Sequence, residues 1–206
     1  MMRCPRPVLL LLLAALAFLP ARAQDPALRD ALQSGKLLWA SQGDRDGAAS
    51  RFETILAALE PGARTLDEGW TKVLCETYNW MAILDSRVPG KAAQANKRLE
   101  SLLDLDPDFE IDRTVSSAKL QTAFDNLRTQ KFGKVKLTLE PADGTLTLDG
   151  KTKRAEPGIH HLAPGAHVLA YTRPGFQPQD AHFELAAKDT HPVDFKLTRT
   201  SSVVTV

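Results

Sequence analysis

The stretch that decides the fold of this chain lies between Pro141 and Phe176. Residues 141–150 read Pro-Ala-Asp-Gly-Thr-Leu-Thr-Leu-Asp-Gly, and residues 163–176 read Ala-Pro-Gly-Ala-His-Val-Leu-Ala-Tyr-Thr-Arg-Pro-Gly-Phe. Short runs of alternating apolar residues stand between Asp-Gly and Pro-Gly pairs, a pattern typical of strands joined by tight turns. This stretch therefore predicts a small antiparallel β-domain.

The same pattern extends over residues 134–200. Alternating apolar residues predict a first strand around Val135–Leu139 and later strands around Phe183–Leu185 and Val193–Leu197. Short strands at close intervals, all joined by turn residues, favour a small antiparallel β-sandwich.

Turn and core residues follow one another in a fixed order in this region: Pro141, Leu146, Leu148, Asp149, Gly150, Lys151, Pro164, Gly165, His167, Gly175 and Phe176. This order resembles the PEGA domain, a β-rich module of bacterial and archaeal envelope proteins. Asp143 and Gly144 stand where that family has Gly-Ala, and Phe176 replaces its usual tyrosine. The resemblance implies an envelope or surface module without catalytic activity. It assigns structural turn roles to Pro141, Asp149, Gly150, Pro164, Gly165, His167, Gly175 and Phe176.

Residues 24–131 carry helical periodicity instead. Apolar residues recur at three- and four-residue spacing in five segments, which are 26–39, 48–59, 66–86, 92–106 and 116–130. Asp25-Pro26 is a helix-start signal, whereas Pro61-Gly62 and Pro89-Gly90 break helices. The sequence therefore predicts an α+β fold in two domains, with N-terminal α-helical hairpins in residues 24–131 and the β-sandwich in 134–200.

The first hairpin has aromatic, small, small, aromatic and proline residues at Trp39, Gly43, Ala48, Phe52 and Pro61. The second follows the same order less closely, at Tyr78, Ala82, Ala95, Leu99 and Pro107. This order resembles a degenerate tetratricopeptide repeat, although the two prolines lie further apart than that family's period of about 34 residues. The resemblance implies a surface for a protein or peptide partner. A helical bundle that only packs and spaces is the alternative.

Residues 1–23 have the three parts of a secretory signal. Arg3 and Arg6 precede the apolar run Val8–Leu19, and Ala21-Arg22-Ala23 forms a small-x-small cleavage site. A membrane anchor is the alternative, but the run is shorter than the about 20 residues that span a bilayer. We therefore expect export to the periplasm or cell surface and no membrane span after signal cleavage.

The composition of the chain excludes some partners. Its 206 residues carry a formal net charge of +1, which gives no electrostatic case for nucleic acid or an anionic membrane surface. Cys75 is the only cysteine after the signal, so no internal disulfide framework is expected. Its apolar neighbours predict a buried thiol.

The histidines are the main candidates for metal binding. His160 and His161 are adjacent in a predicted strand, so they are expected to face opposite sides and not to chelate one ion together. His167 is expected to bind backbone groups of its turn. Asp143 and Asp149 could form a carboxylate pair, but both lie in predicted turns. The sequence therefore predicts no enzyme, no metal and no cofactor.

These patterns favour a non-catalytic cell-envelope adaptor or scaffold, with helices for protein partners and a β-domain for surface attachment or spacing. Trp70, Tyr78 and Trp80 form the candidate partner surface if they are exposed, and they belong to the core if they are not. The alternative function is a carbohydrate-binding module for peptidoglycan or surface polysaccharide. It requires exposed aromatic residues in the β half, where the candidates are Tyr171, Phe176, Phe183 and Phe195.

The last residues, 201–206, are strongly β-prone. They predict either a closing edge strand or the start of a further β repeat.

Overall fold

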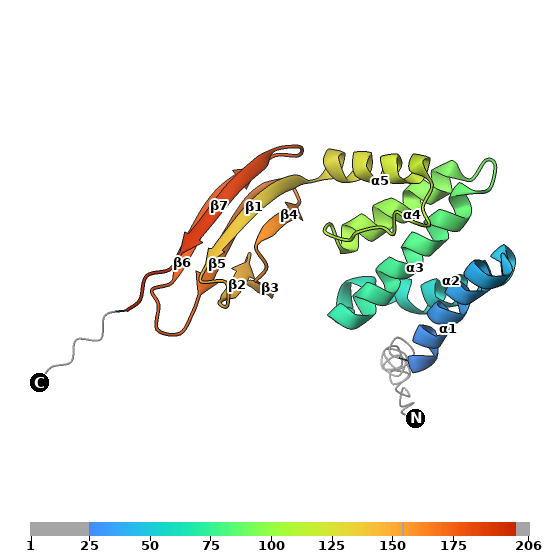
Figure 1. The fold of residues 1–206 in the computed structure, drawn as a ribbon, viewed down its shortest axis with the longest axis horizontal. Coiled ribbons are helices and arrows are strands. Elements are labelled where there is room, and N and C mark those ends of the chain that lie inside the picture. The colour runs from blue at the N-terminus through green and yellow to red at the C-terminus, as the bar shows by residue number, and fades with distance from the viewer. Residues whose placement is uncertain (1–24, 154, 201–206) are drawn as a thin grey trace, which may run out of the picture. The chain divides into compact units, whose positions relative to one another are not determined.

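The computed structural model describes residues 25–153 and 155–200, which form five α-helices followed by seven β-strands (Figure 1). The α+β class and the order of helices before strands are therefore confirmed. The predictions for the signal and for the tail at 201–206 lie outside the described residues. The chain divides into two compact units between Trp80 and Met81. The predicted boundary between residues 131 and 134 stays a prediction.

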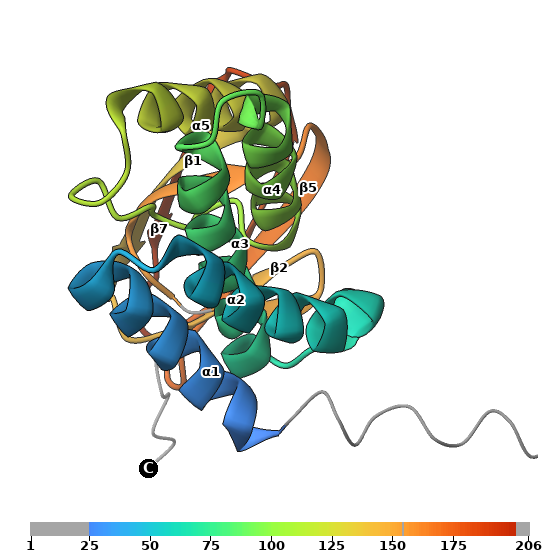
Figure 2. The same ribbon diagram turned by 90° about the vertical axis from the view of Figure 1, so that its right-hand side faces the viewer.

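The first unit contains the hairpin of α1 (Pro26–Leu37) and α2 (Arg45–Leu59), which lie side by side in Figure 2. The predicted start is confirmed, because the Asp25 side chain accepts a hydrogen bond from the amide of Ala27 at 2.9 Å. A π-helical turn, Leu38–Gln42, follows α1, and a 3₁₀ segment, Glu60–Thr65, follows α2.

The predicted apolar stripe of α2 is confirmed, because the following side chains are buried: Ala48, Phe52, Ile55, Leu56 and Leu59. Two details differ. The helix begins at Arg45, three residues before the predicted segment 48–59, because Asp44 caps it. Leu37 does not join the stripe of Leu28 and Leu32, and it is 63% exposed.

The remaining helices are α3 (Glu68–Ser86), α4 (Ala92–Leu105) and α5 (Ala118–Lys131). The predicted break before α4 is confirmed, because Gly90 has a φ of 83° between the two helices. Ser117 caps α5, and its side chain accepts a hydrogen bond from the amide of Leu120. The α4–α5 loop spans residues 106–117, and its Asp108 contacts His161 in the β half.

The β half begins directly after α5. Its strands are β1 (Gly133–Glu140), β2 (Thr145–Leu148), β3 (Lys151–Lys153), β4 (Gly158–Leu162), β5 (Gly165–Thr172), β6 (Gln179–Leu185) and β7 (Thr190–Lys196). They form one sheet in the order β4-β1-β7 and another in the order β3-β2-β5-β6. Buried side chains of both sheets form one core, made up of Val135, Leu137, Leu139, Leu146, Leu169, Tyr171, Phe183, Leu185, Val193, Phe195 and Leu197. The two sheets therefore share a core as a sandwich does.

One strand pairing differs from the antiparallel prediction. β7 runs parallel to β1, with Val135 opposite His191 and Leu139 opposite Phe195. Alternation of apolar residues reports which side chains face the core but not the direction of a strand, so the sequence pattern could not reveal this pairing.

Candidate functional site

Two of the three aromatic residues of the candidate partner surface are buried. Trp70 and Tyr78 are each 5% exposed, and the Arg29 guanidinium lies 4.6 Å from the ring centroid of Trp70. These two residues therefore belong to the helical core, which was the alternative named above. Trp80 is half-buried and stacks on Phe52, with ring centroids 6.3 Å apart.

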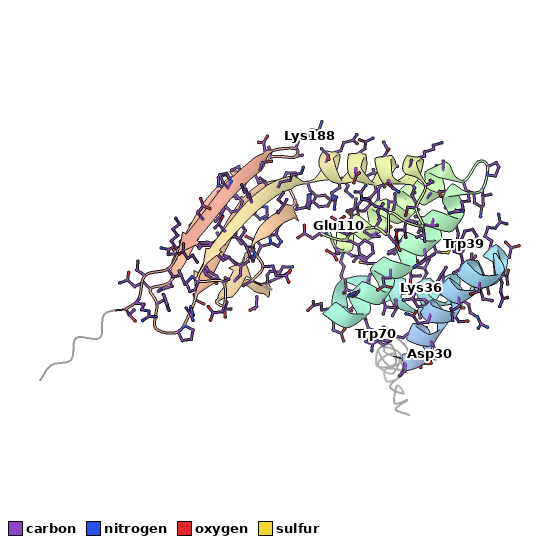
Figure 3. All side chains as sticks on the ribbon, in the orientation of Figure 1. Asp30, Lys36, Trp39, Trp70, Glu110 and Lys188 are labelled. Atoms are coloured by element: carbon purple, nitrogen blue, oxygen red, sulfur yellow. The ribbon has the colours of Figure 1, made fainter. Side chains whose placement is uncertain are left out.

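The helices therefore present no cluster of these aromatic side chains. Trp39, which is half-buried, lies well away from Trp70 (Figure 3). The large apolar side chain that α1 does expose is Leu37. Cys75 is buried, as predicted.

In the β half, Asp149 and His167 connect two turns. Asp149 Oδ2 lies 2.9 Å from His167 Nδ1, and Asp149 Oδ1 accepts a hydrogen bond from the amide of Val168 at 2.9 Å. His167 Nε2 lies 2.8 Å from the carbonyl oxygen of Ala163. The β2–β3 turn is thereby fixed to the turn between β4 and β5. The prediction that His167 binds backbone of its own turn is confirmed, and the Asp149 contact adds a second anchor.

Both ring nitrogens of His167 face hydrogen-bond acceptors, so the protonated imidazolium satisfies this position fully. Burial lowers the pKa of His167, but its hydrogen bonds to the Ala163 carbonyl and to Asp149 outweigh burial and raise this pKa above its ordinary value. The pKa of Asp149 is lowered, first by the Val168 amide and then by His167. The pair is therefore a structural ion pair between turns.

Tyr171 forms a second network that the sequence patterns did not reveal. Its hydroxyl donates to the carbonyl of Pro141 at 2.5 Å and accepts from the amide of Gly144 at 2.8 Å. Its ring is fully buried and lies 5.7 Å from that of Phe195. A Cβ at Gly144 would lie 2.5 Å from Cζ of this ring, so glycine is needed there. Packing against Tyr171 therefore explains the glycine at this position.

Gly175 and Phe176 hold the turn after β5 against the chain after β7. The carbonyl of Gly175 accepts from the amide of Thr200 at 3.0 Å. The guanidinium groups of Arg173 and Arg199 lie 4.7 and 5.9 Å from the ring centroid of Phe176. Phe176 is therefore held by cation–π contacts.

The third network joins the α4–α5 loop to β4. Asp108 Oδ2 lies 3.1 Å from His160 Nδ1, and Asp108 Oδ1 lies 2.9 Å from His161 Nδ1. Asp108 Oδ1 also accepts from the backbone amide of His161 at 2.7 Å. One carboxylate therefore contacts both histidines.

His160 and His161 share this carboxylate, a contact that the expectation about metal chelation did not address. Their positions in the ladder do alternate as predicted, with His160 opposite the buried Val135 and His161 opposite Lys134. However, β4 is an edge strand, so rings on both of its faces can reach a carboxylate beside its free edge. No local pattern around Asp108 could have indicated this partner.

Asp108 and His160 each stabilise the charged form of the other. Burial raises the pKa of Asp108, but hydrogen bonds from His160 and His161 together lower it well below its usual range. The hydrogen bond with Asp108 raises the pKa of His160, and burial opposes it. The ionised carboxylate and a protonated His160 are thus the matched pair.

An open groove lies between β6 and β7, beside a largely blocked strand edge. The Gln179 side chain donates to the carbonyl of Lys196 at 2.9 Å and accepts from its amide at 3.1 Å. Pro192, further along β7, has no amide hydrogen to offer. The groove therefore borders a strand on which Pro192 and Lys196 offer no free amide donor.

The structure describes residues 25–153 and 155–200 of the chain. Within these ranges no group of three or more His, Cys, Asp or Glu side chains could hold a metal ion. No helix in these ranges is long and apolar enough to cross a membrane.

No protein-family model matches the chain, and no curated protein matches its sequence. The resemblances to the PEGA domain and to tetratricopeptide repeats therefore rest only on the residues named in the sequence analysis.

Proposed function

We propose that this chain is a non-catalytic adaptor or scaffold of the bacterial cell envelope. Residues 1–23 direct its export to the periplasm or cell surface. The tetratricopeptide-like helices bind a protein or peptide partner, and the PEGA-like β half serves surface attachment or spacing. The helical and β halves are separate domains in this proposal.

The support for a non-catalytic role comes from what the polar motif residues contact. Asp149 and His167 bind backbone groups of two turns. The Tyr171 hydroxyl binds the backbone of Pro141 and Gly144. The two polar motif residues Asp149 and His167 thus have structural partners, as Tyr171 does, and this observation carries the proposal.

The support for a partner surface on the helices comes from α1. Leu37 is 63% exposed at the end of this helix, next to the half-buried Leu38 and Trp39. One exposed leucine is ordinary on a protein surface, so the support is that three adjacent apolar side chains are exposed or half-buried here. We therefore propose that the partner contact lies at the end of the α1–α2 hairpin.

The carbohydrate-binding alternative loses its main requirement. The candidate platform residues Tyr171, Phe183 and Phe195 are buried, and two arginines cover Phe176. Sugar-binding surfaces stack their ligands on accessible aromatic faces. The described residues of the β half do not offer such a face.

The test is site-specific photo-cross-linking of the full-length protein in its own cells. We expect a photoreactive amino acid at position 37 to give a discrete protein adduct, and one at Thr138, exposed on β1, to give none. The partner is then identified by mass spectrometry and purified. Its affinity for the L37E variant should fall at least about tenfold, because a charge cannot be buried unpaired in an interface, while T138E binds normally. Absence of an adduct at position 37, or equal binding by L37E, contradicts the proposal.

A further inference from the structure

Asp108 occupies the place of a neighbouring strand beside β4. In the sheet β4-β1-β7, β4 has one free edge, and the amide of His161 points to that edge. Backbone groups at such an edge normally bind water or another strand. Here the carboxylate of Asp108 accepts this amide at 2.7 Å, which blocks the edge at His161.

The two histidine rings differ in how many N–H groups their hydrogen bonds require. His160 has an acceptor at each ring nitrogen, Asp108 Oδ2 at 3.1 Å and the carbonyl of Glu156 at 2.7 Å. A neutral imidazole has one N–H, so only the protonated ring can donate to both. His161 uses only Nδ1 toward Asp108, which a neutral tautomer provides. His160 is therefore the member whose hydrogen bonds depend on pH.

We propose that Asp108, His160 and His161 form a pH-dependent latch, which holds the α4–α5 loop on the free edge of β4 while His160 is doubly protonated and loosens when His160 loses a proton.

The groups around His160 agree with this assignment. Two acidic residues act on it, Asp108 from the α4–α5 loop and Glu156 from the segment before β4. Across the ladder His160 lies opposite the uncharged Val135 of β1, while Lys134 and Lys136 are opposite the neighbouring residues of β4.

The sign of the pH dependence follows from these contacts. Because the pKa of His160 is raised, the latch is complete below the ordinary histidine pKa of about 6.5 and weakens as pH rises through the folded value. Because the pKa of Asp108 is lowered, its contribution is present above about pH 4 and is lost only in stronger acid. The latch is thus closed in mild acid and loosens as pH rises through the raised pKa of His160.

Opening the latch would leave the loop attached to α5. Arg128 of α5 binds Glu110 of the loop at 2.8 Å, and Arg113 of the loop binds Asp125 of α5 at 2.9 Å. These pairs contain no group that titrates near neutrality. A rise in pH therefore acts on the contact between loop and strand, which exposes the β4 edge at His161.

The first test is titration of the histidine side chains by NMR in the mature full-length protein. We expect His160 to titrate above its ordinary value in the wild type and to return toward that value in D108N, which keeps the shape of the side chain but removes its charge. D112N is the matched control, because Asp112 carries the same charge in the same loop but binds Thr114. A wild-type His160 at or below its ordinary pKa, or a raised pKa that persists in D108N, overturns the latch.

The second test is hydrogen exchange at the His161 amide, with protection corrected for the intrinsic rate at each pH. We expect protection in the wild type to fall at least about tenfold between pH 5.5 and pH 8.5, the size of losing one charge-assisted hydrogen bond. D108N should show low protection at both pH values, and D112N should behave like the wild type. Equal wild-type protection at both pH values overturns the latch, and this comparison does not depend on any variant folding.

Discussion

The hydroxyl group of Tyr171 ties the segment before β2 to β5. In Y171F the ring still fills the core, but the Pro141 carbonyl and the Gly144 amide lose their partner. We expect the free energy of unfolding to fall by about 1–3 kcal/mol, the cost of leaving buried polar groups unpaired.

Urea denaturation of the purified protein measures this loss. The control is T172V, which removes an exposed hydroxyl from the next residue and should stay within about 0.5 kcal/mol of the wild type. A Y171F protein as stable as T172V would show that water or a shifted backbone replaces the hydroxyl.

His167 makes the stability of the β half depend on pH. Its raised pKa means that its stabilisation is fully present below about pH 6.5 and is lost as pH rises through the folded value. We therefore expect H167Q to be more destabilised, relative to the wild type, at pH 5.5 than at pH 8.5.

The matched control is H182Q, because the His182 side chain is 67% exposed and lies on β6 of the same sheet. H182Q shows what replacing an exposed histidine of this sheet does by itself at each pH. Urea denaturation at the two pH values provides the comparison, and an H167Q deficit that grows with pH would contradict the ion pair between turns.

At the scale of elements, the β2–β3 hairpin depends on the backbone of its turn. Asp149 and Gly150 have φ values of 51° and 76°, both in the left-handed region that favours glycine. A Cβ at Gly150 would meet no atom within 4 Å, so any cost of G150A comes from backbone conformation alone. We expect about 1–2 kcal/mol of destabilisation.

G62A is the control for this prediction. Gly62 also has room for a Cβ, whose nearest neighbour would be Thr65 Oγ1 at 3.6 Å, but its φ is −113°. Alanine there should be neutral or slightly stabilising, because it restricts the unfolded chain. Thermal unfolding followed by circular dichroism compares the two variants, and equal effects would contradict the role of positive φ.

The elements that the sequence predicted correctly are those whose signals are local. The Asp25-Pro26 cap, the stripe of α2 and the alternation of β1 each lie within one element, and all three are confirmed. Helix and strand periods arise from neighbouring residues, so one sequence is sufficient to reveal them.

The contacts that the sequence could not reveal join distant residues. Asp108 is 52 positions from His160, and Tyr171 is 30 positions from Pro141. Gly35 is a further example. Glycine inside a helix is unfavourable, but a Cβ at position 35 would lie 2.6 Å from the ring of Phe52, which explains the glycine. Such pairs depend on how elements pack, which periodicity does not encode.

At the scale of the whole molecule, the proposed two-domain organisation predicts that the helices and the β half have separate apolar cores. The core of the β half is built entirely from residues between Val135 and Leu197, while the α1–α2 hairpin buries Phe52 and its neighbours. Because hydrophobic stabilisation acts through direct contact, a cavity in one core should not weaken the other.

F195A and F52A test this independence in the full-length protein. Each removes a side chain that is at most 2% exposed, which costs about 3–5 kcal/mol in the core concerned. We expect F195A to speed hydrogen exchange across β1–β7 while α1 and α2 keep their wild-type protection, and F52A to do the reverse. The comparison remains valid even if the mutated region unfolds completely, because the measurement is hydrogen-exchange protection in the region that was not mutated. Loss of protection in both regions by either variant would mean that the chain unfolds as one cooperative unit, and that the helices and the β half are not the separable modules of the proposed adaptor.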